Sequence, residues 1–191
     1  KIFENYCFPA VKGQSCLNFK WCLFFDINTP SFYKQKILDF SQRLSIFNPI
    51  YIESMEELEG SFQSFIKNNI DDNESHIITT RIDNDDIIHQ DFIATIQSLF
   101  VFSELAVIDL QDGYQVSIDT PKPEVRRYKH PSNAFISIIE ESNTFQTVVS
   151  RDHYDWQTER QVIVYDKCPM WMELSHQENY VNHRQVKLKK A

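Results

Sequence analysis

Glycine is scarce in this sequence, and its scarcity excludes two common nucleotide-binding loops. Only Gly13, Gly60 and Gly113 occur among 191 residues. Neither a GxGxxG fingerprint nor a Walker-type GxxxxGK[ST] loop can be written with glycines at these positions. A glycine-rich phosphate loop is therefore not available to this protein.

Paired cysteines, long apolar runs and an excess of positive charge are also missing. The four cysteines form no CxxC pair and mostly adjoin apolar residues, as reduced core cysteines do. No apolar run approaches the roughly 18 residues of a membrane span. The 27 acidic and 19 basic side chains give a formal net charge of −8, which argues against binding nucleic acid through overall charge.

What the sequence does contain is typical of one soluble globular domain. Hydrophobic residues make up 42% and aromatic ones 14%, which argues against disorder. A chain of this length buries more than about 65% of its unfolded surface. We expect a single domain over residues 1–191, located in the cytoplasm. The chain begins at Lys1 without a methionine or a signal-like segment, so we also expect residues to precede it.

Short β-rich runs alternate with amphipathic stretches in the first half of the chain. The expected strands are 21–25, 49–52 and 76–80, and the expected helices are 30–44, 54–68 and 92–100. Three strand–helix repeats are typical of a parallel sheet with helices on its faces. The pattern predicts an α/β, Rossmann-like fold.

The pattern changes beyond residue 105 to a mixed, partly β half. Two strands, 106–110 and 114–118, are expected to be joined by a turn at Asp112-Gly113. Segments 145–149 and 161–165 are further strand candidates, and the basic stretch 184–190 is expected to be an exposed tail.

The run Asp83-Asn84-Asp85-Asp86 is the strongest candidate for a site, because it follows the third expected strand. Carboxyl ends of parallel strands border the ligand crevice. Three carboxylates this close repel one another unless a cation compensates, and oxygen ligands suit Mg²⁺ or Mn²⁺. In extended chain Arg81, Asp83 and Asp85 lie on one side. The alternatives are a solvated loop or, for Asp86, a cap of the next helix.

Several ordered segments resemble a known family of enzymes. Residues 7–11 with Gln14, followed by 18–26, resemble the start of GT-A glycosyltransferases, and 80–86 resembles their DxD motif. Segments 133–140 and 169–182 narrow the resemblance to a bacterial family of rhamnosyltransferases. The resemblance spans residues 3–184.

The resemblance implies a GT-A-like, mostly parallel sheet whose first strand would precede Lys1. It also implies a nucleotide-binding half over residues 1–104 and an acceptor-side half over 105–191. The implied reaction moves a sugar, rhamnose by the family's name, from a nucleoside-diphosphate donor to a hydroxyl acceptor, with inversion. The partners would be a nucleotide sugar and a glycan or lipid-linked acceptor of bacterial polysaccharide synthesis. Contact of the lysine-containing tail with the inner membrane surface is left open.

The metal ligands follow from the same resemblance. Asp85 is the first choice for a direct ligand of Mn²⁺ or Mg²⁺, and Asp83 would contact the metal, its waters or the ribose. Some GT-A enzymes add a C-terminal histidine to the metal shell, which would be His176 here, with His153 as the runner-up. Structural roles are the alternative for each histidine.

Four further residues complete the candidate site. Asp26 resembles the aspartate that meets the nucleotide base, with a strand-terminal acid in a turn as the alternative. Arg81 would lie near the nucleotide or hold the aspartates. Glu140, beside Glu141, is the candidate general base, because partial burial next to a like charge raises a carboxyl pKa. The alternatives are that both glutamates lie on the surface, or that Asp152 takes this role. Trp171 would either stack on a sugar or belong to the core.

Two other functions remain open at this point. A nucleotidyltransferase also uses acidic strand ends and Mg²⁺, although its phosphate loop rich in glycine and basic residues is not seen. A non-catalytic carbohydrate- or metal-binding domain would keep the acidic cluster for structure. Turnover separates the two classes, because a binding domain does not hydrolyse a nucleotide sugar.

Overall fold

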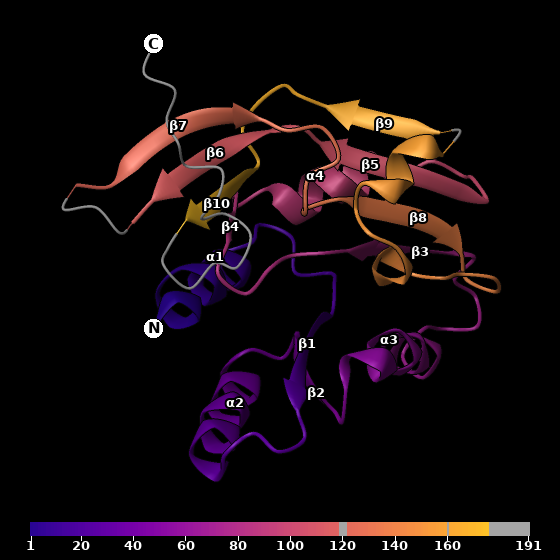
Figure 1. The fold of residues 1–191 in the computed structure, drawn as a ribbon. Coiled ribbons are helices and arrows are strands. Elements are labelled where there is room, and N and C mark those ends of the chain that lie inside the picture. Colours follow the sequence, from indigo (N-terminus) through magenta and orange to yellow (C-terminus); the bar gives the residue numbers. More distant parts are fainter. Residues whose placement is uncertain (119–121, 160, 176–191) are drawn as a thin grey trace.

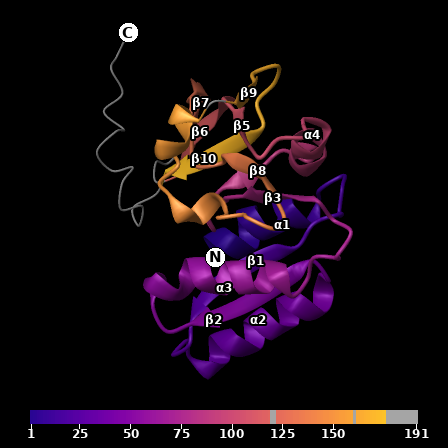
Figure 2. The ribbon, with the colours of Figure 1, turned by 90° about the vertical axis from the view of Figure 1, so that its right-hand side faces the viewer.

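The computed structural model describes residues 1–118, 122–159 and 161–175. The first strands are β1 (Trp21–Asp26) and β2 (Phe47–Ile52), which pair in parallel. They lie between α2 (Ser31–Arg43) and α3 (Leu58–Lys67), as both Figure 1 and Figure 2 show. The apolar run of β1 is thus covered on both sides by amphipathic helices, as expected for a strand of this composition.

The remaining strands form two four-stranded sheets. One has the order β4 (Ile87–Ile88), β10 (Trp171–Ser175), β6 (Asp112–Ser117), β7 (Glu124–Lys129), and the other β3 (His76–Thr80), β8 (Ser137–Glu141), β5 (Leu105–Leu110), β9 (Val162–Tyr165). The helical segments still to be placed are η1 (Phe3–Cys7), α1 (Phe8–Lys12), η2 (Met55–Glu57), α4 (Phe92–Ser98), η3 (Val148–Ser150) and η4 (Asp155–Thr158).

A continuous hydrophobic core connects these layers. Buried side chains of α1, β1 and β2 pack in the same cluster as those of α4, β5 and β10. A smaller cluster surrounds Trp156, whose side chain is fully buried. The mixed α/β class predicted from the sequence is confirmed, and so are the strands expected near residues 21–25, 49–52, 76–80, 106–110 and 161–165.

A mostly parallel GT-A-like sheet is not confirmed. The pairs β1–β2, β10–β6 and β5–β9 are parallel. The pairs β3–β8, β5–β8, β6–β7 and β4–β10 are antiparallel. One sheet is mixed because β8 runs antiparallel to both β3 and β5, and the other because β10 runs parallel to β6 but antiparallel to β4.

Two local predictions for the second half are wrong. Asp112 and Gly113 form no hairpin turn, because both lie in β6 and the chain passes from β5 through Gln111 into the other sheet. The expected strand 145–149 is a loop followed by the short helix η3. Thr147 has a φ of 82° there, which takes the backbone out of the extended region.

Candidate functional site

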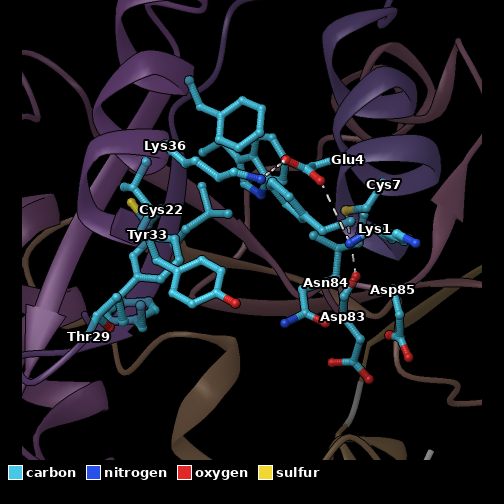
Figure 3. A pocket seen from close by; sticks show the side chains of 18 of the residues that line it. Lys1, Glu4, Cys7, Cys22, Thr29, Tyr33, Lys36, Asp83, Asn84 and Asp85 are labelled. Atoms are coloured by element: carbon cyan, nitrogen blue, oxygen red, sulfur yellow. Dashed lines mark hydrogen bonds and ion pairs between the residues drawn. The ribbon is translucent and has the colours of Figure 1, made fainter. Parts of the chain in front are cut away.

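A cleft of about 970 Å³ lies between η1, β1, α2 and the loop that follows β3. Its interior is apolar and is lined by Phe3, Trp21, Leu23, Phe25, Phe40 and Ile82. Asp83, Asn84 and Asp85 also line it, and in Figure 3 the carboxylates of Asp83 and Asp85 point to the same side. The cleft therefore combines an apolar interior with an acidic margin.

Asp86 anchors this acidic loop instead of capping a helix. Its Oδ1 accepts the N–H of Leu174 in β10 at 3.0 Å, and its side chain is buried, with a relative exposure of 4%. Burial raises the pKa of the Asp86 carboxyl well above its usual range. The loop is thus fixed to β10 by its third aspartate, and the other two, Asp83 and Asp85, line the cleft.

Arg81 pairs with the acidic loop as well. Its Nη2 and Nε lie 3.3 and 3.4 Å from Oδ1 of Asp83. Both side chains are partly exposed, so the pair contributes little to folding stability. Its effect is on orientation, because it fixes Asp83 at the margin of the cleft.

The structure places the other nucleotide and metal candidates less directly. Asp26 ends β1 and accepts the N–H of Asn28 at 2.6 Å, while its neighbour Phe25 lines the cleft. His176 lies outside the described residues; Ser175, immediately before it, ends β10. The runner-up His153 is bonded through Nδ1 to the carbonyl oxygen of Ser132 at 2.6 Å.

Glu140 lies away from the acidic loop. In the antiparallel register Glu140 faces Ile77 of β3. Ile77 precedes Thr80, the last residue of β3, by three residues, so Glu140 lies roughly 10 Å along the strand from the end where the acidic loop begins. Its two carboxylate oxygens accept the N–H groups of Gln146 and Thr147 at 2.8 and 2.9 Å. Burial raises the pKa of Glu140, and these two hydrogen bonds lower it. Glu140 therefore holds the loop after β8 and is not placed to serve as the general base.

We expect Glu140→Ala to destabilise the fold by about 3 kcal/mol, because it removes the charged acceptor of two N–H groups, one of them buried. Guanidinium unfolding measures the loss. Glu141→Ala is the matched control, since the adjacent side chain points to the opposite face of β8, and it should change stability by less than about 0.5 kcal/mol. A folded Glu140→Ala protein that keeps its turnover supports the structural role; a stable variant with no activity contradicts it.

Thiol chemistry is not favoured in the cleft. Cys7 and Cys22 both line it, and burial raises the pKa of each thiol to about 12. At neutral pH both are uncharged and therefore poor nucleophiles and metal ligands. All four cysteines are free, as the sequence predicts.

Sequence reasoning missed Glu173 as a neighbour of the acidic loop. Met172 of β10 faces Ile87 of β4, so the antiparallel register carries Glu173 alongside the residue that precedes β4, Asp86. Glu173 is also one of the negative charges that raise the pKa of Asp86. Nothing local marks this residue in the sequence, because the pairing joins segments more than 80 residues apart.

The described residues contain no group of three or more histidine, cysteine, aspartate or glutamate side chains that could hold a metal ion by itself. Within the same residues no helix is long and apolar enough to cross a membrane. The candidate site is therefore a pair of carboxylates at the margin of a cleft.

These features define a mixed α/β protein with two carboxylates at the margin of a cleft, on the loop that follows the edge strand β3. The family described as "Putative rhamnosyl transferase" matches residues 1–188, and the chain belongs to this family. The match confirms the resemblance drawn from the sequence, and the family's name indicates a glycosyltransferase. No protein of curated function matches the chain.

Proposed function

We propose that the protein is a metal-dependent glycosyltransferase. It moves a sugar, rhamnose by the family's name, from a nucleoside-diphosphate donor to a hydroxyl group of a bacterial glycan or lipid-linked acceptor. The observation that carries the proposal is the position of Asp83 and Asp85 at the margin of the cleft, on a loop held by Asp86 and Arg81. Family membership supports the class of reaction.

The two carboxylates fit a metal that binds together with its substrate. Mg²⁺ is commonly held by one or two carboxylates, with substrate phosphates and waters completing the shell. Asp83 and Asp85 supply the hard oxygen donors that Mg²⁺ and Mn²⁺ prefer. When bound, the ion would neutralise the negative charge that grows on the diphosphate leaving group.

The chain's own residues orient the donor. Asp85 would be the direct metal ligand, and Asp83, held by Arg81, would contact the metal, its waters or the ribose. His176 is proposed as an additional ligand, since Ser175 ends β10 and the backbone of that strand contacts the acidic loop at Asp86. Asp26 is proposed to meet the base, because β1 brings it to the end of the cleft-lining segment 21–25.

We also propose that the protein has a GT-A-like sheet. In this sheet a further strand would lie in space between β1 and β3. The N–H groups of Trp21 and Ile27 donate to the carbonyl oxygens of Ile46 and Ile52, on the side of β1 where β2 lies. Because successive N–H groups of a strand point to opposite sides, those of Cys22 and Phe24 point into the cleft. Residues 21–25 all line the cleft, which requires that the edge of the strand and not one face borders it. An extended segment in the apolar part would pair with this edge and leave the acidic margin for the nucleotide.

Thermal stability with nucleotides tests the proposal directly. We expect Mn²⁺ together with one of UDP, GDP and dTDP to raise the melting temperature of the full gene product, while neither component alone does so. At a hundredfold excess over Kd, binding stabilises the folded state by about 2.7 kcal/mol. Slow hydrolysis of the matching nucleotide sugar should accompany the shift. No shift with any nucleotide would favour a non-catalytic binding domain.

A further inference from the structure

One face of the sheet β4–β10–β6–β7 carries aromatic rings beside hydrogen-bonding groups. The register aligns Trp171 with Gly113 and Gly113 with Tyr128. Glu173, Gln115 and Arg126 form the next row on the same face, because side chains two residues apart point the same way. Nε2 of Gln115 donates to Oε2 of Glu173 at 3.4 Å, which confirms that these two side chains share the face.

The rings form a connected group that extends beyond the sheet. The ring centroids of Tyr128 and His130 are 5.1 Å apart, and those of His130 and Tyr154 are 6.1 Å apart. His153 packs on Tyr154 at 4.0 Å. Tyr154 is 50% exposed, while Tyr128, His130 and His153 are partly buried behind it, so Tyr154 is the ring that the group presents most fully to solvent. We call Tyr128, His130, His153 and Tyr154 the aromatic platform.

Backbone contacts hold the aromatic platform in place. The N–H of His130 donates to the carbonyl oxygen of Gln111 at 2.8 Å, and Nδ1 of His153 lies 2.6 Å from the carbonyl oxygen of Ser132. The rings of Tyr128 and the buried Trp171 lie roughly perpendicular to each other, with their centroids 6.1 Å apart. A rigid aromatic surface loses little conformational entropy when a ligand binds.

The charges around the aromatic platform favour a neutral, hydroxyl-rich ligand over a phosphate. Burial lowers the pKa of His130, so its imidazole is uncharged at neutral pH. Arg126 lies over the Tyr128 ring at 5.1 Å, and Arg127 is bonded to Asp112. Glu173 adds a negative charge that repels anions and accepts hydrogen bonds from hydroxyl groups. Gln115 is buried and positions Glu173 from within the sheet. Aromatic rings with an adjacent carboxylate suit the apolar face and the hydroxyls of a sugar.

This face of the sheet adjoins the acidic loop, which indicates what a sugar bound there would do. Glu173 belongs to the same strand as Leu174, whose N–H binds Asp86. We propose that the aromatic platform and Glu173 bind the sugar ring of the acceptor. The role of this surface as an acceptor subsite rests on the proposed transferase function. Its ability to bind a sugar does not depend on that function. It would hold the acceptor beside the loop that binds the donor.

Saturation-transfer NMR with methyl glycosides of rhamnose, glucose, galactose and N-acetylglucosamine tests the proposal without donor or metal. We expect at least one glycoside to bind the wild type, and Tyr154→Ala to weaken binding about tenfold by removing an exposed stacking ring. Glu173→Gln, which keeps the shape of the side chain, should weaken it as well. Tyr51→Ala is the matched control, a part-exposed tyrosine on β2, and should bind normally.

The outcomes separate this proposal from the proposed function. Binding that both Tyr154→Ala and Glu173→Gln weaken supports the proposed sugar site, whatever the nucleotide experiment shows. Absence of glycoside binding alongside a normal Mn²⁺–nucleotide shift overturns the aromatic platform alone. Binding that persists in both variants, or that inorganic phosphate displaces, also overturns it. Near-UV circular dichroism of each variant confirms that it is folded.

Discussion

Replacement of Asp85 by alanine is expected to lower metal-dependent turnover of the nucleotide sugar at least about a hundredfold. The carboxylate is the proposed direct ligand of the ion that neutralises the leaving group, and loss of one such electrostatic contact commonly costs that much in rate. The folded state should persist, because Asp85 lies at the margin of the cleft and the buried anchor of the loop is Asp86. The Mn²⁺-dependent rise in melting temperature with nucleotide should disappear together with turnover.

Two further variants make the Asp85 result specific. Asp72→Ala removes one carboxylate from an exposed loop outside the cleft and should keep full turnover. Arg81→Ala should reduce turnover less than Asp85→Ala, because it only frees Asp83 from an oriented position. Equal turnover in Asp85→Ala and Asp72→Ala would contradict the metal site at this loop.

The parts of the molecule that the sequence predicts well depend on local signals. The apolar run before Asp26 and the run before Arg81 contain their own strand propensity, and both are strands in the structure. Position at the end of a strand also directs Asp83 and Asp85 to a cleft, and the structure places them there. Periodicity and chain position suffice for such features.

Pairing between distant segments explains what the sequence does not predict. The Asp112-Gly113 pair predicts a turn that would pair the strands on either side of it. In the structure β5 and β6 are separated only by Gln111, yet they belong to different sheets. Glu140 ends an apolar run near Glu141, but only the register with β3 reveals that it faces Ile77, away from the acidic loop. Glu173 reaches that loop through β4–β10 pairing alone. Tertiary contacts of this kind leave no local periodic pattern.

Trp171 illustrates how the structure decides between the two roles left open for it. The side chain is 3% exposed, its Nε1 donates to the carbonyl oxygen of Leu110 at 2.6 Å, and its ring stacks on Phe135 at 5.0 Å. The indole lies over Gly113, so closely that a Cβ at that position would overlap the ring. Trp171 is therefore a core residue that packs beside Tyr128 on the same face of the sheet, and it is too buried to stack on a sugar itself.

This contact predicts that two destabilising substitutions compensate each other. Trp171→Ala should cost about 4 kcal/mol of unfolding free energy, because it leaves a large cavity in the core and removes the hydrogen bond from the indole to the carbonyl oxygen of Leu110. Gly113→Ala alone should cost about 3 kcal/mol, since its methyl group forces the indole out of place. In the Trp171→Ala background the same methyl group enters the cavity. The double variant should then be at least about 2 kcal/mol more stable than the sum of the single effects.

Guanidinium unfolding of the four proteins in this cycle measures the coupling between positions 113 and 171. Gly60→Ala is the matched control for the glycine substitution, because nothing lies within 4 Å of a Cβ at that position. It sits in α3, where alanine is the better helix former, so it should stabilise both backgrounds by the same amount, about 1 kcal/mol. Additive effects at positions 113 and 171 would show that the indole does not rest on β6. The support proposed for the aromatic platform would then fail with it.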